Sequence, residues 1–88
     1  MTTEPWSVEF ERRADRDLER LGPPVKQRVL AAIDRLASDP RSANLRQLKG
    51  RPESRLRVGD WRVVVELDTA ARTIIIQRVL PRGRAYDR

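Results

Sequence analysis

The chain opens with an alternation of apolar and polar residues and then changes to helical spacing. Trp6, Val8 and Phe10 alternate with polar residues, which predicts a short strand with one buried face. An amphipathic helix is predicted next, ending at the Gly-Pro-Pro of residues 22–24. Its apolar residues recur at intervals of three or four: Phe10, Ala14, Leu18 and Leu21.

A second helix is predicted from about Pro24 to the Asp-Pro pair at residues 39–40. Proline is accepted in the first turn of a helix, and the residue before a proline disfavours helical geometry. The predicted apolar stripe consists of Val25, Val29, Ile33 and Leu36, with Ala32 and Ala37 beside it. Because only a few residues separate the two helices, they are expected to form an antiparallel helical hairpin.

Beyond Pro40 the pattern predicts a polar segment followed by strands. Residues 41–54 are broken by glycine and proline, with Leu45 and Leu48 expected to lie beneath them. Strands are predicted at 55–58, 61–67 and 73–80, with a Gly-Asp turn at 59–60. The isoleucine run at 74–76 predicts a central strand buried on both faces.

The order of these elements predicts an α+β fold. An N-terminal strand and a helical hairpin precede a three-stranded antiparallel meander, with one sheet and the helices on one of its faces. The chain of 88 residues is expected to form a single domain, 1–88, around one small core. That core should bring Val29, Ile33 and Leu36 against residues of the sheet, namely Trp61, Val63, Val65 and Ile74 or Ile76, and Trp6 is expected to be a core residue as well.

Composition excludes several kinds of site. The chain contains no cysteine and no histidine, so disulfides, thiolate or imidazole metal sites and histidine acid–base catalysis are excluded. No spacing of carboxylates indicates a metal, and no glycine-rich loop indicates a nucleotide, so no cofactor is expected. The sequence also lacks an apolar run long enough for a membrane helix and an N-terminal secretory pattern, which predicts a cytoplasmic protein.

The positive charge lies in the second half of the chain. The net charge is +6, and 17 of the 19 basic residues are arginines. Residues 1–40 carry seven basic and eight acidic groups, whereas residues 41–88 carry twelve and five. Codon usage that favours arginine would explain the excess of arginine over lysine, but not this asymmetry. The pattern predicts a polyanionic partner, because arginine binds phosphate bidentately.

Arginines recur on consecutive predicted strands and define a candidate phosphate-binding face. Arg55 and Arg57 are two residues apart and therefore share one strand face, and Arg62 follows across the turn, pointing away from Trp61 and Val63. A solvated strand face that makes no specific contact is the alternative interpretation. Further candidate RNA-binding residues are Arg46, Lys49, Arg51, Arg78 and Arg84.

The C-terminal tail carries the one tyrosine. Tyr86 stands near Arg82 and Arg84, and it could stack on a base or donate a proton; the alternative is a tail residue that packs weakly. Acidic residues of the first helix alternate with arginines, which predicts an ion-paired, exposed helix surface that includes Asp15 and Asp17.

The second half of the chain resembles the RelE/ParE superfamily of bacterial toxins. The resemblance rests on an LKG turn at 48–50, the RLRVGDWRVV stretch at 55–64 and the QRVLPRGRAY stretch at 77–86. The helical hairpin ahead of these motifs also matches, so nearly the whole chain is covered.

The resemblance implies a RelE-like toxin of a toxin–antitoxin module. RelE-like members are endoribonucleases that cut mRNA in the ribosomal A site and leave a 2′,3′-cyclic phosphate. Carried over by motif, the catalytic positions are Arg55, Arg57, Arg62, Arg82 and Tyr86. The implied partners are the ribosome with its mRNA and an acidic antitoxin, with no membrane partner and no small-molecule cofactor.

The sequence departs from RelE-like members in one respect that bears on catalysis. Those members often carry lysine at one or both of the positions of Arg55 and Arg57, and arginine does not lose its proton in proteins. The general base is therefore unassigned. Two alternatives stay open: a ParE-like inhibitor of DNA gyrase, and a basic nucleic-acid-binding module without enzymatic activity.

Overall fold

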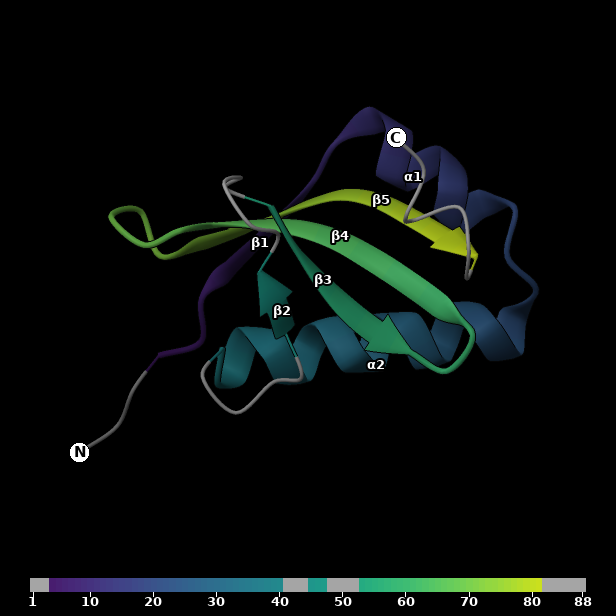
Figure 1. The fold of residues 1–88 in the computed structure, drawn as a ribbon, viewed down its shortest axis with the longest axis horizontal. Helices are drawn as coiled ribbons and strands as arrows, with labels where there is room; N and C mark the ends of the chain where they lie inside the picture. The colour runs from purple at the N-terminus through teal and green to yellow at the C-terminus, as the bar shows by residue number, and fades with distance from the viewer. Residues whose placement is uncertain (1–3, 41–44, 48–52, 82–88) are drawn as a thin grey trace.

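The structure is a computed structural model that describes residues 4–40, 45–47 and 53–81. It is an α+β fold in which two helices accompany a mixed five-stranded sheet of order β1-β5-β4-β3-β2 (Figure 1). The predicted fold class is confirmed. The elements are β1 (Ser7–Phe10), α1 (Arg12–Glu19), α2 (Pro23–Ser38), β2 (Leu45–Gln47), β3 (Glu53–Val58), β4 (Trp61–Asp68) and β5 (Thr73–Pro81).

The first helix is shorter than the spacing predicts. Phe10 belongs to β1, and Glu11 has extended backbone geometry as the N-cap of α1. The helix therefore begins at Arg12, and its buried residues include Ala14 and Leu18 as predicted. Phe10 is in the strand rather than the helix because β1, which also contains Val8, pairs with β5 along its length, and this pairing keeps Phe10 extended.

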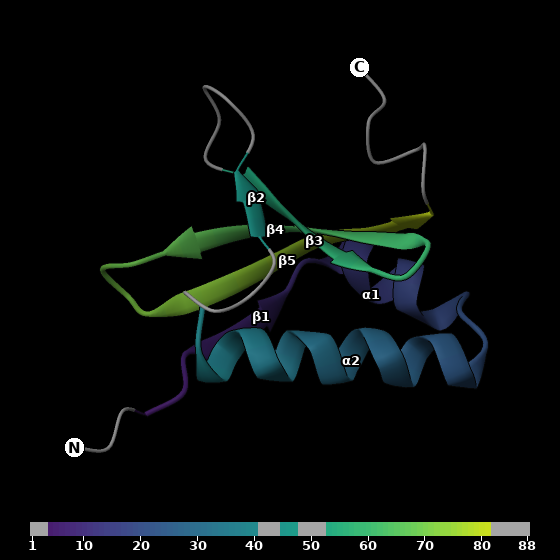
Figure 2. The same ribbon diagram turned by 60° about the horizontal axis from the view of Figure 1, so that its bottom comes forward.

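The second helix agrees closely with its prediction. It runs from Pro23 to Ser38, with proline in the first turn. It extends beneath the sheet (Figure 2), and its buried residues come from the predicted stripe: Val29, Ile33, Leu36 and Ala37. Among the described residues, no helix combines the length and the apolar character that crossing a membrane requires.

The sheet has one parallel pair and three antiparallel pairs. β3, β4 and β5 form the predicted meander, and β1 joins β5 in parallel because the two helices carry the chain back to the same end of the sheet. The short strand β2 pairs with β3 where the sequence predicts only a polar segment. Leu45 in this strand is half-buried.

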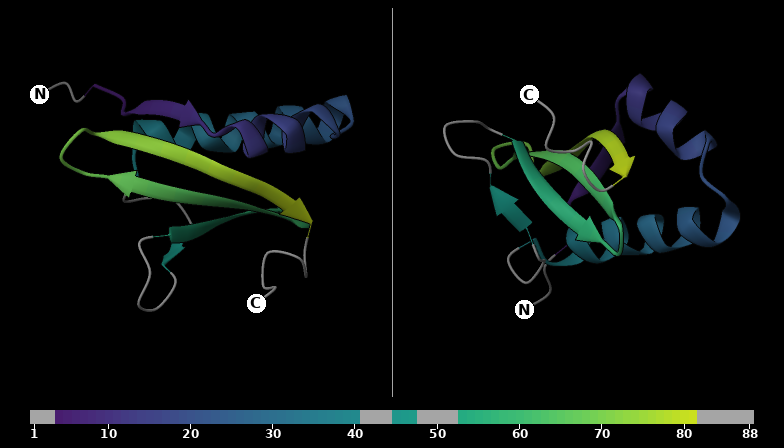
Figure 3. Two further views of the ribbon diagram at one scale, coloured as in Figure 1. Left: turned by 90° about the horizontal axis from the view of Figure 1, so that it is seen from above. Right: turned by 45° about the vertical axis from the view of Figure 1, so that its right-hand side comes forward.

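β4 rather than β5 is the central strand. β1 pairs with β5 only as far as Ile76, so the rest of that edge has no neighbouring strand among the described residues. Ile75 is half-buried rather than buried, which corrects the prediction of a strand enclosed on both faces. The reason is that the helices lie in one layer on one side of the sheet (Figure 3), so no helix in the described part of the chain covers its other face.

A two-residue turn and a bulge set the register of the arginine-bearing strands. Gly59, with a φ of 59°, lies in the turn that joins β3 to β4, where a left-handed conformation favours glycine. A register shift between Val64 and Val65 leaves Gln77 of β5 as an extra residue. Side chains alternate along a strand, so the shift turns Arg78 to the face opposite the buried Ile76 and Val79.

The core lies between the helical layer and the sheet. Val29, Ile33 and Leu36 are buried together with Val63, Val65, Ile74 and Ile76 of the sheet, as predicted. Trp6 and Trp61 are partly buried against this core. The face of the sheet away from the core is the face that carries the arginines.

Candidate nucleic-acid interface

Three arginines gather on neighbouring strands of the outer sheet face. Arg57 of β3 is the register partner of Arg62 of β4, and Arg55 is the partner of Val64. Cross-strand partners point to the same side of a sheet, so these side chains share one face. The convergence that the spacing predicts is therefore present. We call Arg55, Arg57 and Arg62 the arginine face.

The three arginines differ in exposure. Arg57 is exposed, Arg55 is half-buried, and Arg62 is only 5% exposed, with its Nη1 donating a 3.3 Å hydrogen bond to the Trp61 carbonyl. The burial of Arg62 differs from the alternative interpretation of a solvated strand face. A charge at a partly buried position acts through a lower dielectric than one in water, which strengthens its interaction with an anion.

Carboxylates lie along the same face, one step from the arginines. Glu53 and Glu66 are register partners on β3 and β4, two residues before Arg55 and two after Val64. The Gln77 side chain donates a 3.2 Å hydrogen bond to Glu66. The face is thus acidic at one end and basic at the other. Sequence reasoning missed Glu66, although the hairpin register at 59–60 would have placed it.

A buried carboxylate joins the first helix to the last strand. Asp17 of α1 is 9% exposed, and its Oδ2 accepts hydrogen bonds from Arg78 Nε at 2.8 Å and the Val79 amide at 2.9 Å. Its Oδ1 accepts a third, from Arg78 Nη2, at 3.3 Å. The prediction of an exposed Asp17 on the helix surface is wrong. Its carboxylate lies against the edge of β5 beyond the end of β1, where it accepts these hydrogen bonds.

The electrostatics of this pair follow from its contacts. Burial by itself would raise the pKa of the Asp17 carboxyl, but the hydrogen bonds from Arg78 and Val79 and the charge of Arg78 outweigh burial and lower it. In return, the hydrogen bond to Asp17 raises the pKa of Arg78. The pair is therefore ionised at neutral pH.

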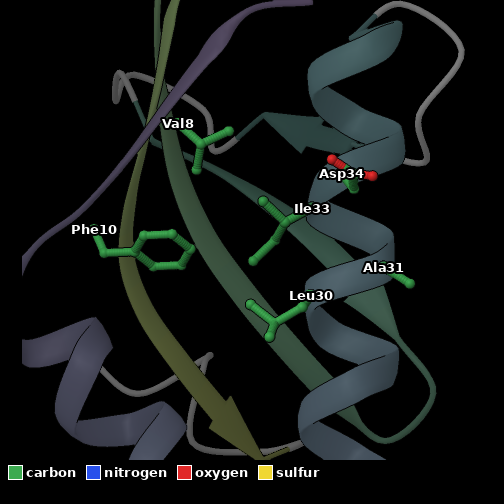
Figure 4. A pocket seen from close by; sticks show the side chains of 6 residues that line it. All are labelled: Val8, Phe10, Leu30, Ala31, Ile33 and Asp34. Atoms are coloured by element: carbon green, nitrogen blue, oxygen red, sulfur yellow. The ribbon is translucent and has the colours of Figure 1, made fainter.

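An apolar groove lies between β1 and α2, away from the arginine face. Figure 4 shows the side chains of Val8 and Phe10 directed toward Leu30 and Ile33 across the groove. Ala31 and Asp34 complete a lining around a volume of about 430 Å³. Leu30 is 39% exposed although it is a large apolar residue. This groove was not predicted from the sequence, because Leu30 falls outside the predicted stripe.

Several predicted site residues lie outside the described residues. These are Lys49, Arg51, Arg82, Arg84 and Tyr86. For Arg46 the structure gives only the backbone pairing of β2 with β3, in which it is the register partner of Arg55. Within the described ranges, no three acidic side chains are grouped closely enough to hold a metal ion.

Comparison with known proteins finds one family and a set of similar folds. The model of the ParE toxin of type II toxin–antitoxin systems matches residues 8–86. No curated protein matches the chain.

Three solved structures illustrate the likeness. A chain in the toxin–antitoxin complex RelBE2 from Mycobacterium tuberculosis is 26% identical, with 93% of this chain and 97% of that chain covered and a TM-score of 0.81. The archaeal RelE–RelB complex from Pyrococcus horikoshii gives 26% identity, coverages of 91% and 98%, and a TM-score of 0.79. The chromosomal ParDE system from P. aeruginosa, at 15% identity, coverages of 92% and 100% and a TM-score of 0.71, shares the fold.

Proposed function

The chain belongs to the ParE toxin family of type II toxin–antitoxin systems, within the RelE/ParE superfamily, and from its arginine face and its likeness to the solved RelE chains we propose that it inhibits translation by cutting mRNA on the ribosome. The observation that carries the proposal is the arginine face. Three guanidinium groups on two adjacent strands offer a rigid surface for the phosphates of a polyanion. Rigid strands hold such groups more accurately than loops do.

The proposed reaction is an internal transfer at one phosphate of the message. The 2′-hydroxyl oxygen attacks the adjacent phosphorus and loses its proton to a base. The bond from phosphorus to the 5′-oxygen breaks, and that oxygen gains a proton. The products are a 2′,3′-cyclic phosphate and a 5′-hydroxyl, and no oxidant, metal or cofactor is consumed.

The arginine face fits the electrostatic demand of this reaction. Negative charge builds on the phosphate oxygens as the pentacoordinate state forms, and fixed cations stabilise that charge. Arg57 is the exposed member and is proposed to contact the phosphate. The buried Arg62 beside it is proposed to stabilise the phosphate charge without touching it. Stabilisation by fixed charge needs no proton transfer from arginine, which keeps its proton.

The proton transfers require other groups. The chain has no histidine, and the described carboxylates of this face include Glu53 and Glu66. The resemblance assigns Arg82 and Tyr86 to the site, and Tyr86 is proposed to stack on a base and hold the 2′-hydroxyl in line. Ribosomal groups are proposed to supply part of the acid–base chemistry.

Inhibition of DNA gyrase is the second candidate. It is favoured by one specific observation, the match of residues 8–86 to the family model of the ParE toxin. The absence of histidine and the presence of arginine where lysine is common are also compatible with a toxin that binds its target without cutting RNA.

Induced expression in bacteria separates the two candidates. We expect rapid arrest of protein synthesis, with new message ends inside codons detected by primer extension on a translated message. Purified gyrase should keep its supercoiling activity in the presence of the toxin. Intact messages together with inhibited gyrase would overturn the proposal in favour of the second candidate.

An acidic antitoxin is the proposed partner. The matched structures from M. tuberculosis and P. horikoshii are complexes of toxin with antitoxin. For this chain we propose that an acidic segment covers the arginine face, by charge complementarity with the basic half of the molecule. Apolar residues of the same antitoxin are proposed to enter the groove at Leu30 and Phe10, where apolar surface is open to solvent.

A further inference from the structure

The register of the sheet places a fourth cation beside the arginine face. Arg78 of β5 is the partner of Val64, which is itself the partner of Arg55 on the next strand. The row therefore runs across the outer face from Arg55 to Arg78. By position alone Arg78 belongs among the phosphate-binding residues, as the sequence analysis expects.

The contacts of the Arg78 side chain indicate a different role. The Arg78 side chain is 31% exposed, and two of its guanidinium nitrogens, Nε and Nη2, face the two oxygens of Asp17. These two nitrogens form one of the edges through which a guanidinium binds phosphate bidentately. A phosphate at this edge of the guanidinium would have to displace a nearly buried carboxylate that is also held by the Val79 amide. Displacement would leave that amide and that carboxylate without their present partners, which is costly.

We propose that Asp17 withdraws Arg78 from the polyanion-binding surface and so sets the boundary of that surface at β4. The inference rests on the proposed function, because it concerns how RNA meets the same sheet face. Asp17 is a positioning residue in this account: it neutralises Arg78 and fixes the strand end that leads to Arg82. The RNA backbone then passes over Arg55 and Arg57 without a phosphate contact at Arg78.

The test is the salt dependence of RNA binding by the full chain. The probe is a single-stranded RNA with 2′-O-methyl groups, which has no free 2′-hydroxyl and cannot be cut. Binding therefore reports on the surface whether or not the toxin cleaves RNA, and failure of this inference is separable from failure of the proposed function. The slope of log binding constant against log salt counts phosphate contacts, at about 0.7 per contact for single strands.

Asp17→Asn releases Arg78 and should steepen the slope by about 0.7, one additional contact. Asp15→Asn is the matched control: it removes the same charge two residues away on the same helix, at an exposed position. It should leave the slope at its wild-type value. A slope for Asp17→Asn no steeper than that of Asp15→Asn would overturn the proposal.

A second variant keeps the test decisive if Asp17→Asn alone does not fold. The double variant Asp17→Asn/Arg78→Gln replaces the ion pair by neutral groups of similar size. Under the proposal its slope equals that of the wild type, because Arg78 makes no phosphate contact to lose. A slope shallower by about 0.7 would show that Arg78 binds phosphate in the wild type and would refute the inference.

Discussion

Burial separates residues of like charge into different roles. Arg57 is exposed, Arg62 is buried beside it, and Arg78 is held by a carboxylate, although all three are arginines near one sheet face. A buried arginine also contributes packing, so Arg62→Ala would mix stability with activity. Substitution of the exposed Arg57 tests the proposed phosphate contact with less effect on stability.

The Asp17 contacts predict a stability that depends on pH. The folded-state pKa of Asp17 lies below the ordinary value of 3.8, so the stabilisation is present above that value and is lost as pH falls through the folded pKa. At pH 7, Asp17→Asn should lower the free energy of unfolding by about 1–3 kcal/mol. We expect the lower part of this range, because Arg78 is partly exposed.

The measurement is urea denaturation of wild type, Asp17→Asn and Asp15→Asn from pH 7 downward. The gap between wild type and Asp17→Asn should begin to shrink below about pH 4, where the Asp17 carboxyl of the unfolded chain takes up its proton, and should close as pH falls through the lower folded-state pKa. Asp15→Asn should stay close to the wild type, because Asp15 is exposed. A gap for Asp17→Asn that is constant with pH would contradict the assignment.

At the scale of elements, the burial of one face of α2 against the sheet stabilises the fold. Ile33 is 3% exposed in the middle of its buried stripe, so Ile33→Ala should lower the free energy of unfolding by about 2–5 kcal/mol. Leu30 lies on the same helix at 39% exposure, and Leu30→Ala should cost about 1 kcal/mol or less. Chemical denaturation of both variants checks the difference, and equal losses would show that the helix face is misassigned.

Elements with a strong local pattern could be predicted from the sequence. The spacing from Val29 to Leu36 predicts the buried face of α2, and the Gly-Asp turn at 59–60 predicts the β3–β4 pairing. The strand β2 could not be predicted in this way, because three residues carry too little alternation. Its pairing depends on β3, which comes later in the chain.

The candidate site was predictable in part. The alternation that places Arg55 and Arg57 on one face is local, and the structure agrees with it. The role of Asp17 is not local, since its partner Arg78 is 61 residues away. The bulge at Gln77 that turns Arg78 outward also has no local signal, because it depends on the register between two strands.

For the whole molecule, a substitution in the apolar groove should affect antitoxin binding without affecting the arginine face. Leu30→Asp places a charge in the groove and should weaken the complex with the proposed antitoxin, while cleavage of mRNA by the free toxin is unchanged. Gln27→Asp is the control, since Gln27 is exposed on the same helix and does not line the groove. Calorimetric titration measures both, and equal affinities would exclude the groove from the interface.

The proposed antitoxin should also cover the basic half of the chain. Its binding should weaken with added salt, because part of the attraction is between opposite charges at the surface. A structure of the complex gives the direct check. An antitoxin that leaves Arg55, Arg57 and Arg62 all open to solvent would contradict direct occlusion of the arginine face.

The central claim is that the arginine face stabilises charge during cleavage of mRNA on the ribosome. The most direct test is the rate constant for cutting a message in the A site of purified ribosomes with saturating toxin. Arg57→Ala should lower this rate on the order of 100-fold. Arg57→Lys should recover little, because a point charge does not reproduce the bidentate fork. Arg13→Ala, which removes an exposed arginine of α1, should leave the rate unchanged. Cutting by Arg57→Ala at the wild-type rate, or no cutting by the wild type, would contradict the account.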